Sequence, residues 1–358
     1  MSDVRPSSGE MGEEVTFFTD RKTGLRGITV LDVAENRPCV GACRSRPYVE
    51  EERALADALR QARTTTTKAL LAGLPVGGGC TVLLSDTPIG SRAATPMPAV
   101  GRAVESFGGR YHLMPDLQGD LRDMDQAATT TAYVLGRSDQ MAIDAIEATA
   151  LGLRFGIETA VRRRLGRDGL MGVRVGITGL GAIGFRLAEL LREKGARLTV
   201  ADRDPRRTER AVRALGINCV ATEEIVHLDM DVFAPTAAKD VIDDGILAHL
   251  RCKIVAGAVD DPLRSPTLGQ ALHERGILYA PDTIINAGGL IALAQPLLAE
   301  EGECLPVLKQ IEAIADRMEM VVDLAERLDL PTVVAVGHMA EEARSDRSGS
   351  APGRRLAS

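Results

Sequence analysis

The sequence predicts an α/β protein of two domains, the second of them built around a doubly wound parallel sheet. A chain of 358 residues is too long for one hydrophobic core and fits two domains. The pattern changes at Gly172: from there, short strand-like apolar runs alternate with runs of helical spacing. We therefore expect an N-terminal α/β domain over 15–138 and a doubly wound domain over 139–319, with a cleft between them.

The elements expected in the first domain come from apolar runs and from one amphipathic pattern. Residues 49–65 have apolar side chains at helical spacing, so one face of a helix over this range is apolar. The expected strands are 25–31, 38–42, 80–85 and 110–114, and the other expected helices are 99–107 and 141–164.

In the second domain, strand-like and helix-like runs follow one another regularly. Helices over 304–327 and 332–344 come last, and we expect residues 320–344 to pack back on the first domain. The polar ends of the chain, 1–14 and 345–358, are expected to be disordered. The expected strands are 173–178, 197–201, 232–234, 254–258 and 277–279, with helices over 185–194 and 207–215.

Composition and charge argue against several classes of partner. The net charge is −7 and only 3% of residues are aromatic, with no basic block beside them, so nucleic acid is not expected as a partner. No apolar run approaches the roughly 20 residues that cross a bilayer, so no membrane association is expected. The polar start lacks the apolar core of a signal peptide, so we expect a cytoplasmic protein.

The six cysteines are scattered along the chain without a CxxC pair, which in a cytoplasmic protein predicts reduced thiols. A metal site built from Cys39, Cys43 and Cys80 is disfavoured by the spacing of the first two and by the lack of a nearby histidine. We therefore expect no metal.

A glycine-rich motif, Gly179-Leu180-Gly181-Ala182-Ile183-Gly184, stands in the context that dinucleotide binding requires. It follows an apolar strand and opens an amphipathic helix, and the next strand ends in Asp202. Gly179 permits the tight turn, Gly181 lets the backbone approach a pyrophosphate, and Gly184 permits close helix packing. The helix start at Ala182 and Ile183 offers N–H groups to the phosphates. The sequence therefore predicts a Rossmann domain that binds a dinucleotide.

The residues after the second strand bear on the choice of dinucleotide. Asp202 is expected to accept hydrogen bonds from the adenosine ribose, and its charge repels a 2′-phosphate, which favours NAD(H) over NADP(H). Arg203, Arg206 and Arg207 leave NADP open, because an arginine there pairs with that phosphate. The simpler alternative is a glycine-rich turn in a sheet protein that binds no nucleotide.

A second set of motifs surrounds Lys68, which lies twelve residues before Cys80, with a triple glycine at 77–79 directly before the cysteine. Over roughly 25–293 these motifs resemble the glutamate/leucine/phenylalanine/valine dehydrogenase family, closest to its leucine and phenylalanine enzymes. The other segments that carry the resemblance are 37–44, 57–60, 109–111, 123–125, 148–152 and 279–289.

The resemblance implies roles for individual residues in the oxidative deamination of an amino acid, in which hydride leaves Cα, water adds to the imine and ammonia departs. Lys68 is expected to hold the substrate carboxylate, and Asp116 to exchange protons with the amine. Val40 and Gly41 are expected to line the side-chain pocket. The other residues that the resemblance places at substrate or cofactor are Thr149, Asp260, Asp261 and Asn286, with Ala256 at the cofactor.

The residues alone leave a simpler explanation open for three of these assignments. Lys68 is also explained as a surface lysine, Asp116 as a turn residue after Pro115, and Asn286 as a cap or turn residue. The family resemblance also implies a homo-oligomer, a dimer or larger.

The chain departs from the family pattern where the chemistry is expected. Cys80 stands where the family has its proton-handling lysine, and Asp260-Asp261 stand where it usually has two asparagines. The sequence 144–147 lacks the usual Pro-Ser-Pro-like segment, and four threonines, 64–67, precede Lys68. A cysteine cannot act as a cationic proton donor, and losing one acid–base group costs about 10²–10⁴ in rate.

The departures predict an NAD-dependent oxidoreductase with altered chemistry. Our hypothesis is the reduction of a preformed imine, or of a related double bond, on a carboxylate-bearing small molecule. Asp116, Asp260 or Asp261 would donate the proton, with Cys80 as an alternative thiol acid or nucleophile. Classical deamination of an apolar L-amino acid is the first alternative. A catalytically inactive NAD-binding homologue that acts through protein contacts is the second.

Overall fold

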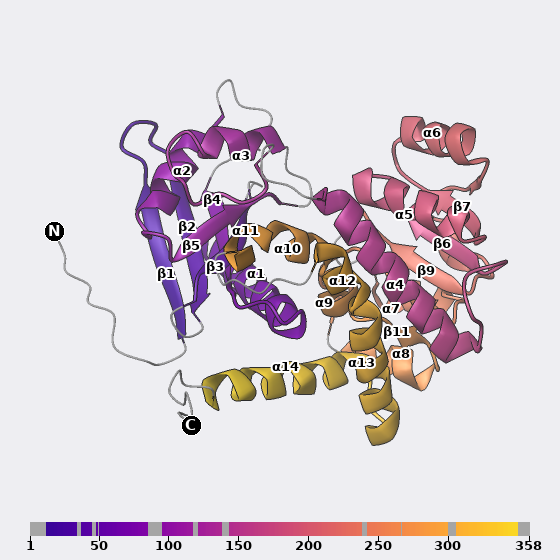
Figure 1. Cartoon of the computed structure of the whole chain (residues 1–358). Coiled ribbons are helices and arrows are strands. Elements are labelled where there is room, and N and C mark those ends of the chain that lie inside the picture. Colours follow the sequence, from indigo (N-terminus) through magenta and orange to yellow (C-terminus); the bar gives the residue numbers. More distant parts are fainter. Residues whose placement is uncertain are drawn as a thin grey trace. The chain divides into compact units, whose positions relative to one another are not determined.

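The computed structural model describes most of the chain and divides it into two compact units. The first is formed by residues 1–142 with 293–302 and 347–358, and the second by 143–292 with 303–346. Figure 1 shows the helices and strands of the chain, coloured along the sequence. The described residues are 12–33, 37–44, 48, 50–84, 95–116, 121–137, 143–237, 242–265, 267–299 and 306–349.

The first unit is built on a mixed sheet with the strand order β1-β2-β4-β3-β5. β2 is antiparallel to β1 and β4, whereas β3 is parallel to β4 and β5. The four strands expected here are present, and β4 begins earlier than expected because the triple glycine belongs to the strand. The bounds are β1 Gly12–Thr19, β2 Arg26–Val33, β3 Cys39–Arg44, β4 Gly77–Leu84 and β5 Tyr111–Met114.

The edge strand β1 corrects one expectation, since the sequence predicts a disordered lead that includes residues 12–14. Local charge favours disorder, but Glu13 forms an ion pair with Arg63 and Glu14 with Arg110, so these charges are compensated in a folded strand. The rest of that lead, residues 1–11, lies outside the described residues.

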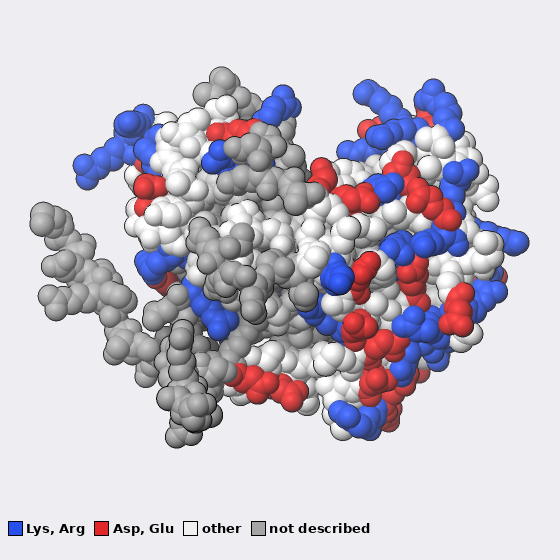
Figure 2. All heavy atoms as spheres, in the orientation of Figure 1, with Lys and Arg blue, Asp and Glu red and all other residues white. Residues whose placement is uncertain are grey.

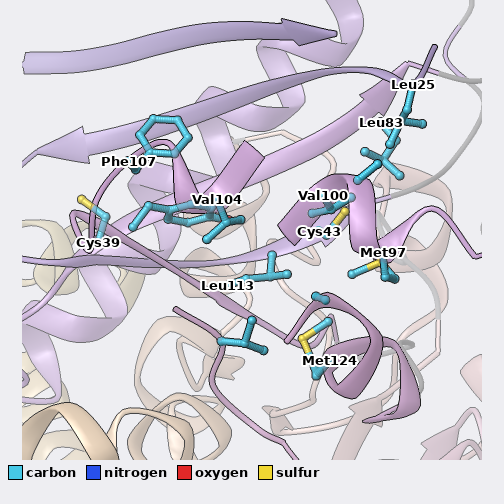
Figure 3. Close-up of a cluster of buried hydrophobic side chains, with 14 of the residues drawn as sticks. Leu25, Cys39, Cys43, Leu83, Met97, Val100, Val104, Phe107, Leu113 and Met124 are labelled. Carbon is cyan, nitrogen blue, oxygen red and sulfur yellow. The ribbon is translucent and has the colours of Figure 1, made fainter. Parts of the chain in front are cut away.

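Helices cover both faces of this sheet (Figure 1). α1 (Glu51–Leu71) packs on one face, and α2 (Met97–Glu105) and α3 (Leu121–Ala127) contribute to the core on the other. Figure 3 shows that second core, where Val100 and Val104 of α2 gather with strand residues such as Leu83 and Leu113. α11 (Gln295–Ala299) lies within a segment grouped with this unit.

Helix α1 continues six residues beyond the predicted end at residue 65. The threonines that make this stretch look unhelical turn their hydroxyls back onto the helix: Thr64 donates to Arg60 O, Thr66 to Ala62 O and Thr67 to Arg63 O. Their hydroxyl groups are therefore satisfied inside the helix.

The second unit contains a parallel sheet with the order β11-β10-β9-β6-β7-β8. β6 stands in the middle, the chain runs outward through β7 and β8, and it then returns to β9 on the other side of β6. This confirms the predicted doubly wound Rossmann sheet. The bounds are β6 Arg174–Thr178, β7 Arg197–Ala201, β8 Asn218–Cys219, β9 Val232–Pro235, β10 Ile254–Val255 and β11 Leu278–Tyr279.

Several short helices of the second unit were not predicted, because they contain too few residues to show the helical spacing of apolar side chains. The helices expected from their spacing are α4 Ala145–Leu165, α5 Ala182–Glu193, α6 Pro205–Leu215 and α14 Thr332–Gly349. The single helix expected over 304–327 is divided at Ala313 into α12 Val307–Glu312 and α13 Ile314–Leu328. The additional ones are α7 Asp244–His249, α8 Thr267–Glu274, α9 Asp282–Ile285, α10 Gly288–Leu293 and a 3₁₀ turn, Ile225–His227.

The last helices group with the second unit, whereas the sequence predicts that residues 320–344 pack on the first domain. Glu319 of α13 forms ion pairs with Arg162 and Arg163 of α4, and Arg163 also pairs with Asp323 at 2.6 Å. α14 extends to Gly349, so residues 345–349 are helical rather than disordered, and 350–358 lie outside the described residues.

The start of α4 explains one departure from the family pattern. Asp144 is the N-cap, and its carboxylate accepts hydrogen bonds from the N–H groups of Ile146 at 2.6 Å and Glu147 at 3.3 Å. Glu147 then forms an ion pair with Arg186 of α5.

Among the described residues, none of the helices is both long and apolar enough to cross a membrane.

Candidate functional site

Lys68 lies in the last turn of α1 and is only 8% exposed. That burial excludes the alternative of an ordinary surface lysine. The C-terminal end of a helix carries partial negative charge, which favours a cation there. The structure thus places a buried lysine in the last turn of a long helix.

Cys80 is 1% exposed and lies in the apolar core between the sheet and α1. Its cluster includes Ile28, Val30, Ala58 and Ala62. The thiol donates a long hydrogen bond of 3.8 Å to Thr81 O. These surroundings are those of a small packing side chain, which is the usual role of a buried cysteine.

The triple glycine before Cys80 is explained by close packing on both faces of β4. A Cβ at Gly78 would overlap the carbonyl oxygen of Ala62, and one at Gly79 would lie 2.8 Å from the ring of Tyr111. Tyr111 donates a hydrogen bond of 3.0 Å to Gly41 O and accepts one of 3.2 Å from Thr81. Burial raises the pKa of Tyr111 well above its usual range, so the hydroxyl stays protonated as a donor.

Val40 and Gly41 lie in the middle of β3, and both are buried. A Cβ at Gly41 would overlap the carbonyl group of Gly79 on the neighbouring strand. The glycine at this position is therefore required by the approach of two strands, whatever it contributes to a pocket.

Asp116 follows β5, and its carboxylate lies 4.0 Å from Arg44 Nε. Arg44 also approaches Asp57, with 3.5 Å between the charged atoms, and donates a hydrogen bond of 2.8 Å to Gln61. The buried carboxylate of Asp57 accepts a hydrogen bond from Tyr48 at 2.6 Å. Asp116 thus stands at the edge of a charged network. The sequence analysis did not single out Arg44 and Asp57, although both belong to motifs that carry the resemblance.

The glycine-rich turn of the second unit has the geometry that its motif predicts. Gly179 has φ of +90°, and a Cβ there would overlap Ala237. A Cβ at Gly184 would overlap Gly179 O, so α5 packs tightly on the turn. At Gly181 a Cβ would meet, among the described residues, only Arg207 Nη1, at 3.9 Å, so the described backbone there leaves room for a phosphate group. Ala182 and Ile183 begin α5 directly beside it.

Asp202 follows β7 directly and supports the turn. Its carboxylate accepts hydrogen bonds from the N–H groups of Leu180 at 2.6 Å and Asp204 at 2.8 Å, and it lies 3.6 Å from Arg207. Arg203 is exposed beside it. Figure 2 shows blue arginine side chains gathered over α6, which carries Arg206, Arg207, Arg210 and Arg213.

Asn286 is 4% exposed and lies after α9, past the carboxyl end of β11. Its Nδ2 group donates to Ala258 O at 3.0 Å and to Asp260 Oδ1 at 2.8 Å. Among the described residues, its Oδ1 atom has no hydrogen-bond partner although it is buried. Ala256, directly after β10, is fully buried, and its N–H donates to Phe233 O at 2.9 Å.

Asp261 and Thr149 complete the predicted residues of this unit. Asp261 has φ of +55°, a conformation that Asp and Asn tolerate, and its N–H donates to Asp282 at 3.0 Å while its side chain is exposed. Thr149 is buried in α4, donates to Ala145 O at 2.7 Å and lies against Gly289. Sequence reasoning missed Asp282, which also accepts a hydrogen bond of 2.7 Å from Tyr279.

The structure places the predicted residues in two sets, one in each unit. Val40, Gly41, Lys68, Cys80 and Asp116 belong to the first unit, and the glycine-rich turn, Asp202 and Asn286 belong to the second. The open backbone at Gly181 and the unsatisfied acceptor on Asn286 both fit a bound dinucleotide.

The cysteines and acidic residues do not form a metal site in the part of the chain that the structure describes. Cys39 and Cys43 are buried in the core, and burial raises the pKa of the Cys39 thiol to about 12. Cys304 lies outside the described residues.

Comparison with known proteins shows which family this chain resembles. The model of the family described as "Glutamate/Leucine/Phenylalanine/Valine dehydrogenase" matches residues 206–299. The leucine dehydrogenase of Geobacillus stearothermophilus is 37% identical over 92% of this chain and 90% of its own length.

Solved structures agree with this match. The crystal structure of L-tryptophan dehydrogenase from Nostoc punctiforme has a TM-score of 0.78 and 32% identity, covering 94% of this chain and 96% of that one. The hetero-hexameric glutamate dehydrogenase of Thermus thermophilus has a TM-score of 0.74 at 23% identity, covers 94% of this chain and 88% of that one, and shows the fold alone. The chain therefore belongs to the glutamate/leucine/phenylalanine/valine dehydrogenase family, whose members are amino-acid dehydrogenases, and it is an oxidoreductase that uses a nicotinamide cofactor.

Proposed function

We propose that this chain transfers hydride between NAD(H) and the Cα of an amino or imino acid, and that its reaction is the reduction of a preformed imine or related double bond. The observation that carries the proposal is the environment of Cys80. Where the family has its proton-handling lysine, this chain has a thiol buried among apolar side chains.

The chemistry that needs the missing lysine is the water-addition half of deamination. Attack of water on an imine requires a group that takes up and returns protons, and a thiol packed against alanine and valine side chains does not replace an amine. Reduction of a preformed C=N bond requires one hydride and one proton but no activated water. The remaining residues therefore support the reductive reaction.

The first unit supplies groups for the substrate. Lys68, a buried lysine, binds the carboxylate, and Asp116, which follows β5, donates the proton. Val40 and Gly41 favour an apolar side chain, in agreement with the names of the leucine and tryptophan dehydrogenases that this chain resembles.

The second unit supplies groups for the cofactor. The turn at Gly179 and Gly181 and the start of α5 receive the pyrophosphate, and the charge of Asp202 favours NAD over NADP. A bound nicotinamide supplies the hydride chemistry. Asp260 and Asp261 are the alternative proton donors of this unit.

Two other functions are consistent with the family. Identity of 37% to a leucine dehydrogenase favours classical deamination of an apolar L-amino acid, with another group in place of the lysine. A catalytically inactive homologue that binds NAD and acts through protein contacts is the alternative without enzymatic activity.

We also propose a homo-oligomer, because the edge strand β1 exposes Val15 and Phe17.

The test is an absorbance assay that follows nicotinamide oxidation and reduction. NAD is combined with a panel of L-amino acids, and NADH with 2-oxo acids plus ammonia or with preformed cyclic imino acids. The proposal expects turnover on imino acids alone. Rapid deamination of an amino acid by the wild-type protein would overturn it, and NADH binding without any turnover would favour the inactive homologue.

Two variants at position 80 separate charge from size. Cys80→Lys is expected to gain deamination, whereas Cys80→Met, which adds similar length without a charge, is not. Because position 80 lies in an apolar core, thermal unfolding of both variants is measured alongside to show that they fold.

Lys68→Met is expected to raise KM for the carboxylate-bearing substrate.

A further inference from the structure

The side-chain oxygen of Asn286 is buried and accepts no hydrogen bond from the described part of the chain. Asn286 is 4% exposed, and Oδ1 has no partner among the described residues. A buried acceptor without a donor is costly, and a ligand that brings a donor would remove that cost.

Asp260 and Ala258 determine which end of the Asn286 amide faces that ligand. Nδ2 donates to Asp260 Oδ1 at 2.8 Å and to Ala258 O at 3.0 Å, which uses both of its N–H groups. A flipped amide would set its oxygen against two acceptors. The bond to a carboxylate is also charge-assisted, and it polarises the amide so that Oδ1 becomes a stronger acceptor.

The position in the sheet indicates the nature of the donor. Ala258 and Asp260 follow β10, Asn286 follows β11, and the glycine-rich turn follows β6. Since these strands are parallel, all three segments lie at the carboxyl edge of one sheet, where a dinucleotide binds. The nicotinamide carboxamide has an NH₂ group, which is a donor of the required kind.

We propose that Asp260 is a positioning residue, which orients Asn286 so that its Oδ1 atom accepts a hydrogen bond from the nicotinamide carboxamide. This inference rests on the proposed function only in requiring that the dinucleotide binds. It assigns Asp260 a role in cofactor recognition, which leaves Asp116 and Asp261 as the proposed proton donors.

The test compares NAD with its 3-acetylpyridine analogue, in which a methyl group replaces the carboxamide NH₂. Dissociation constants for both are measured by titration calorimetry, so no turnover is needed. The readout is the ratio of the two constants, because the other differences between the dinucleotides affect wild type and variant alike.

Relative to wild type, Asn286→Ala and Asp260→Ala are expected to reduce the preference for NAD over the analogue by roughly tenfold. Asp260→Asn keeps an acceptor for Nδ2 and is expected to retain most of the preference. Asp229→Ala is the matched control, since it removes a carboxylate that is 71% exposed and pairs with Arg251 at the surface; its ratio should equal that of wild type.

The outcomes separate this inference from the proposed function. An unchanged ratio in both alanine variants, with NAD still bound, would overturn the role of Asp260 and Asn286 and leave the proposed function standing. Failure of the wild-type protein to bind either dinucleotide would overturn both. If Asp260→Ala does not fold, Asn286→Ala and Asp260→Asn carry the comparison.

Discussion

The N–H group of Gly78 donates a hydrogen bond of 2.9 Å to the hydroxyl of Thr66, joining β4 directly to α1. At this point the helix lies so close to the strand that residue 78 has no room for a side chain. Lys68 stands two residues beyond Thr66 and Cys80 two residues beyond Gly78. The contact therefore lies next to both residues on which the proposed chemistry depends.

Replacing Gly78 is expected to destabilise the protein. In Gly78→Ala the new methyl group overlaps the Ala62 carbonyl oxygen and meets Thr66 Oγ1 at 2.8 Å, so α1 must move away from β4. Overpacking of this kind costs about 1–3 kcal/mol of unfolding free energy. Urea unfolding measures the change. Gly337→Ala is the control, because a Cβ there meets nothing within 4 Å, and it should be neutral or stabilising.

The Thr66 hydroxyl is expected to stabilise the protein because its oxygen accepts the hydrogen bond from Gly78 N–H. Thr66→Val keeps the shape of the side chain but leaves the buried Gly78 N–H without a partner, which costs about 1–3 kcal/mol. Thr67→Val should cost less, because the Thr67 hydroxyl only donates back to Arg63 O within the helix. Equal losses of unfolding free energy in the two variants would show that the bond to Gly78 is not important for stability.

The preference for NAD over NADP is expected to depend on the charge of Asp202. Asp202→Asn removes the repulsion of a 2′-phosphate while Arg207, 3.6 Å away, remains to pair with it. The ratio of NADP to NAD dissociation constants should fall by roughly tenfold, about 1.4 kcal/mol. Calorimetry of both cofactors checks this. Adding Arg207→Ala should reverse part of the gain in NADP binding, and no reversal would exclude Arg207 as the phosphate partner.

The proposed homo-oligomer is expected to involve the β1 edge. Phe17 is 57% exposed and Val15 is 39% exposed on this edge strand, so a charged residue there should weaken association. Light scattering coupled to size exclusion should give a multiple of the chain mass for wild type and a smaller species for Phe17→Lys. Val212→Lys, at an apolar residue of α6 that is 41% exposed, is the control and should leave the mass unchanged.

Features encoded by short-range spacing were predictable. The glycine-rich motif sets backbone conformations within six residues, and its turn, its open Gly181 backbone and its close helix packing are present as expected. The alternation of strands and helices after residue 172 correctly predicted the doubly wound sheet for the same reason. The spacing of apolar residues within each run shows which face of that strand or helix is buried.

Features that depend on distant partners were not predictable. Glu13 and Glu14 suggest a disordered lead, yet Arg63 and Arg110 compensate their charges in β1. The polar tail beyond residue 345 continues α14 to Gly349. In both cases local polarity predicts disorder wrongly. It carries no information about the residues that the segment contacts in the folded protein or about the helix that the segment continues.

The sequence by itself determined the two-domain α/β plan, the dinucleotide-binding turn and the absence of a lysine at position 80, since these follow from residue identity and local spacing. Only the tertiary structure decided that Cys80 faces an apolar core, that Arg44 lies 4.0 Å from Asp116, and that Asn286 donates a hydrogen bond to Asp260. Each of those relationships joins residues that lie on different elements, far apart in the sequence. They exist because folding brings such residues together, and no local period encodes which of them meet.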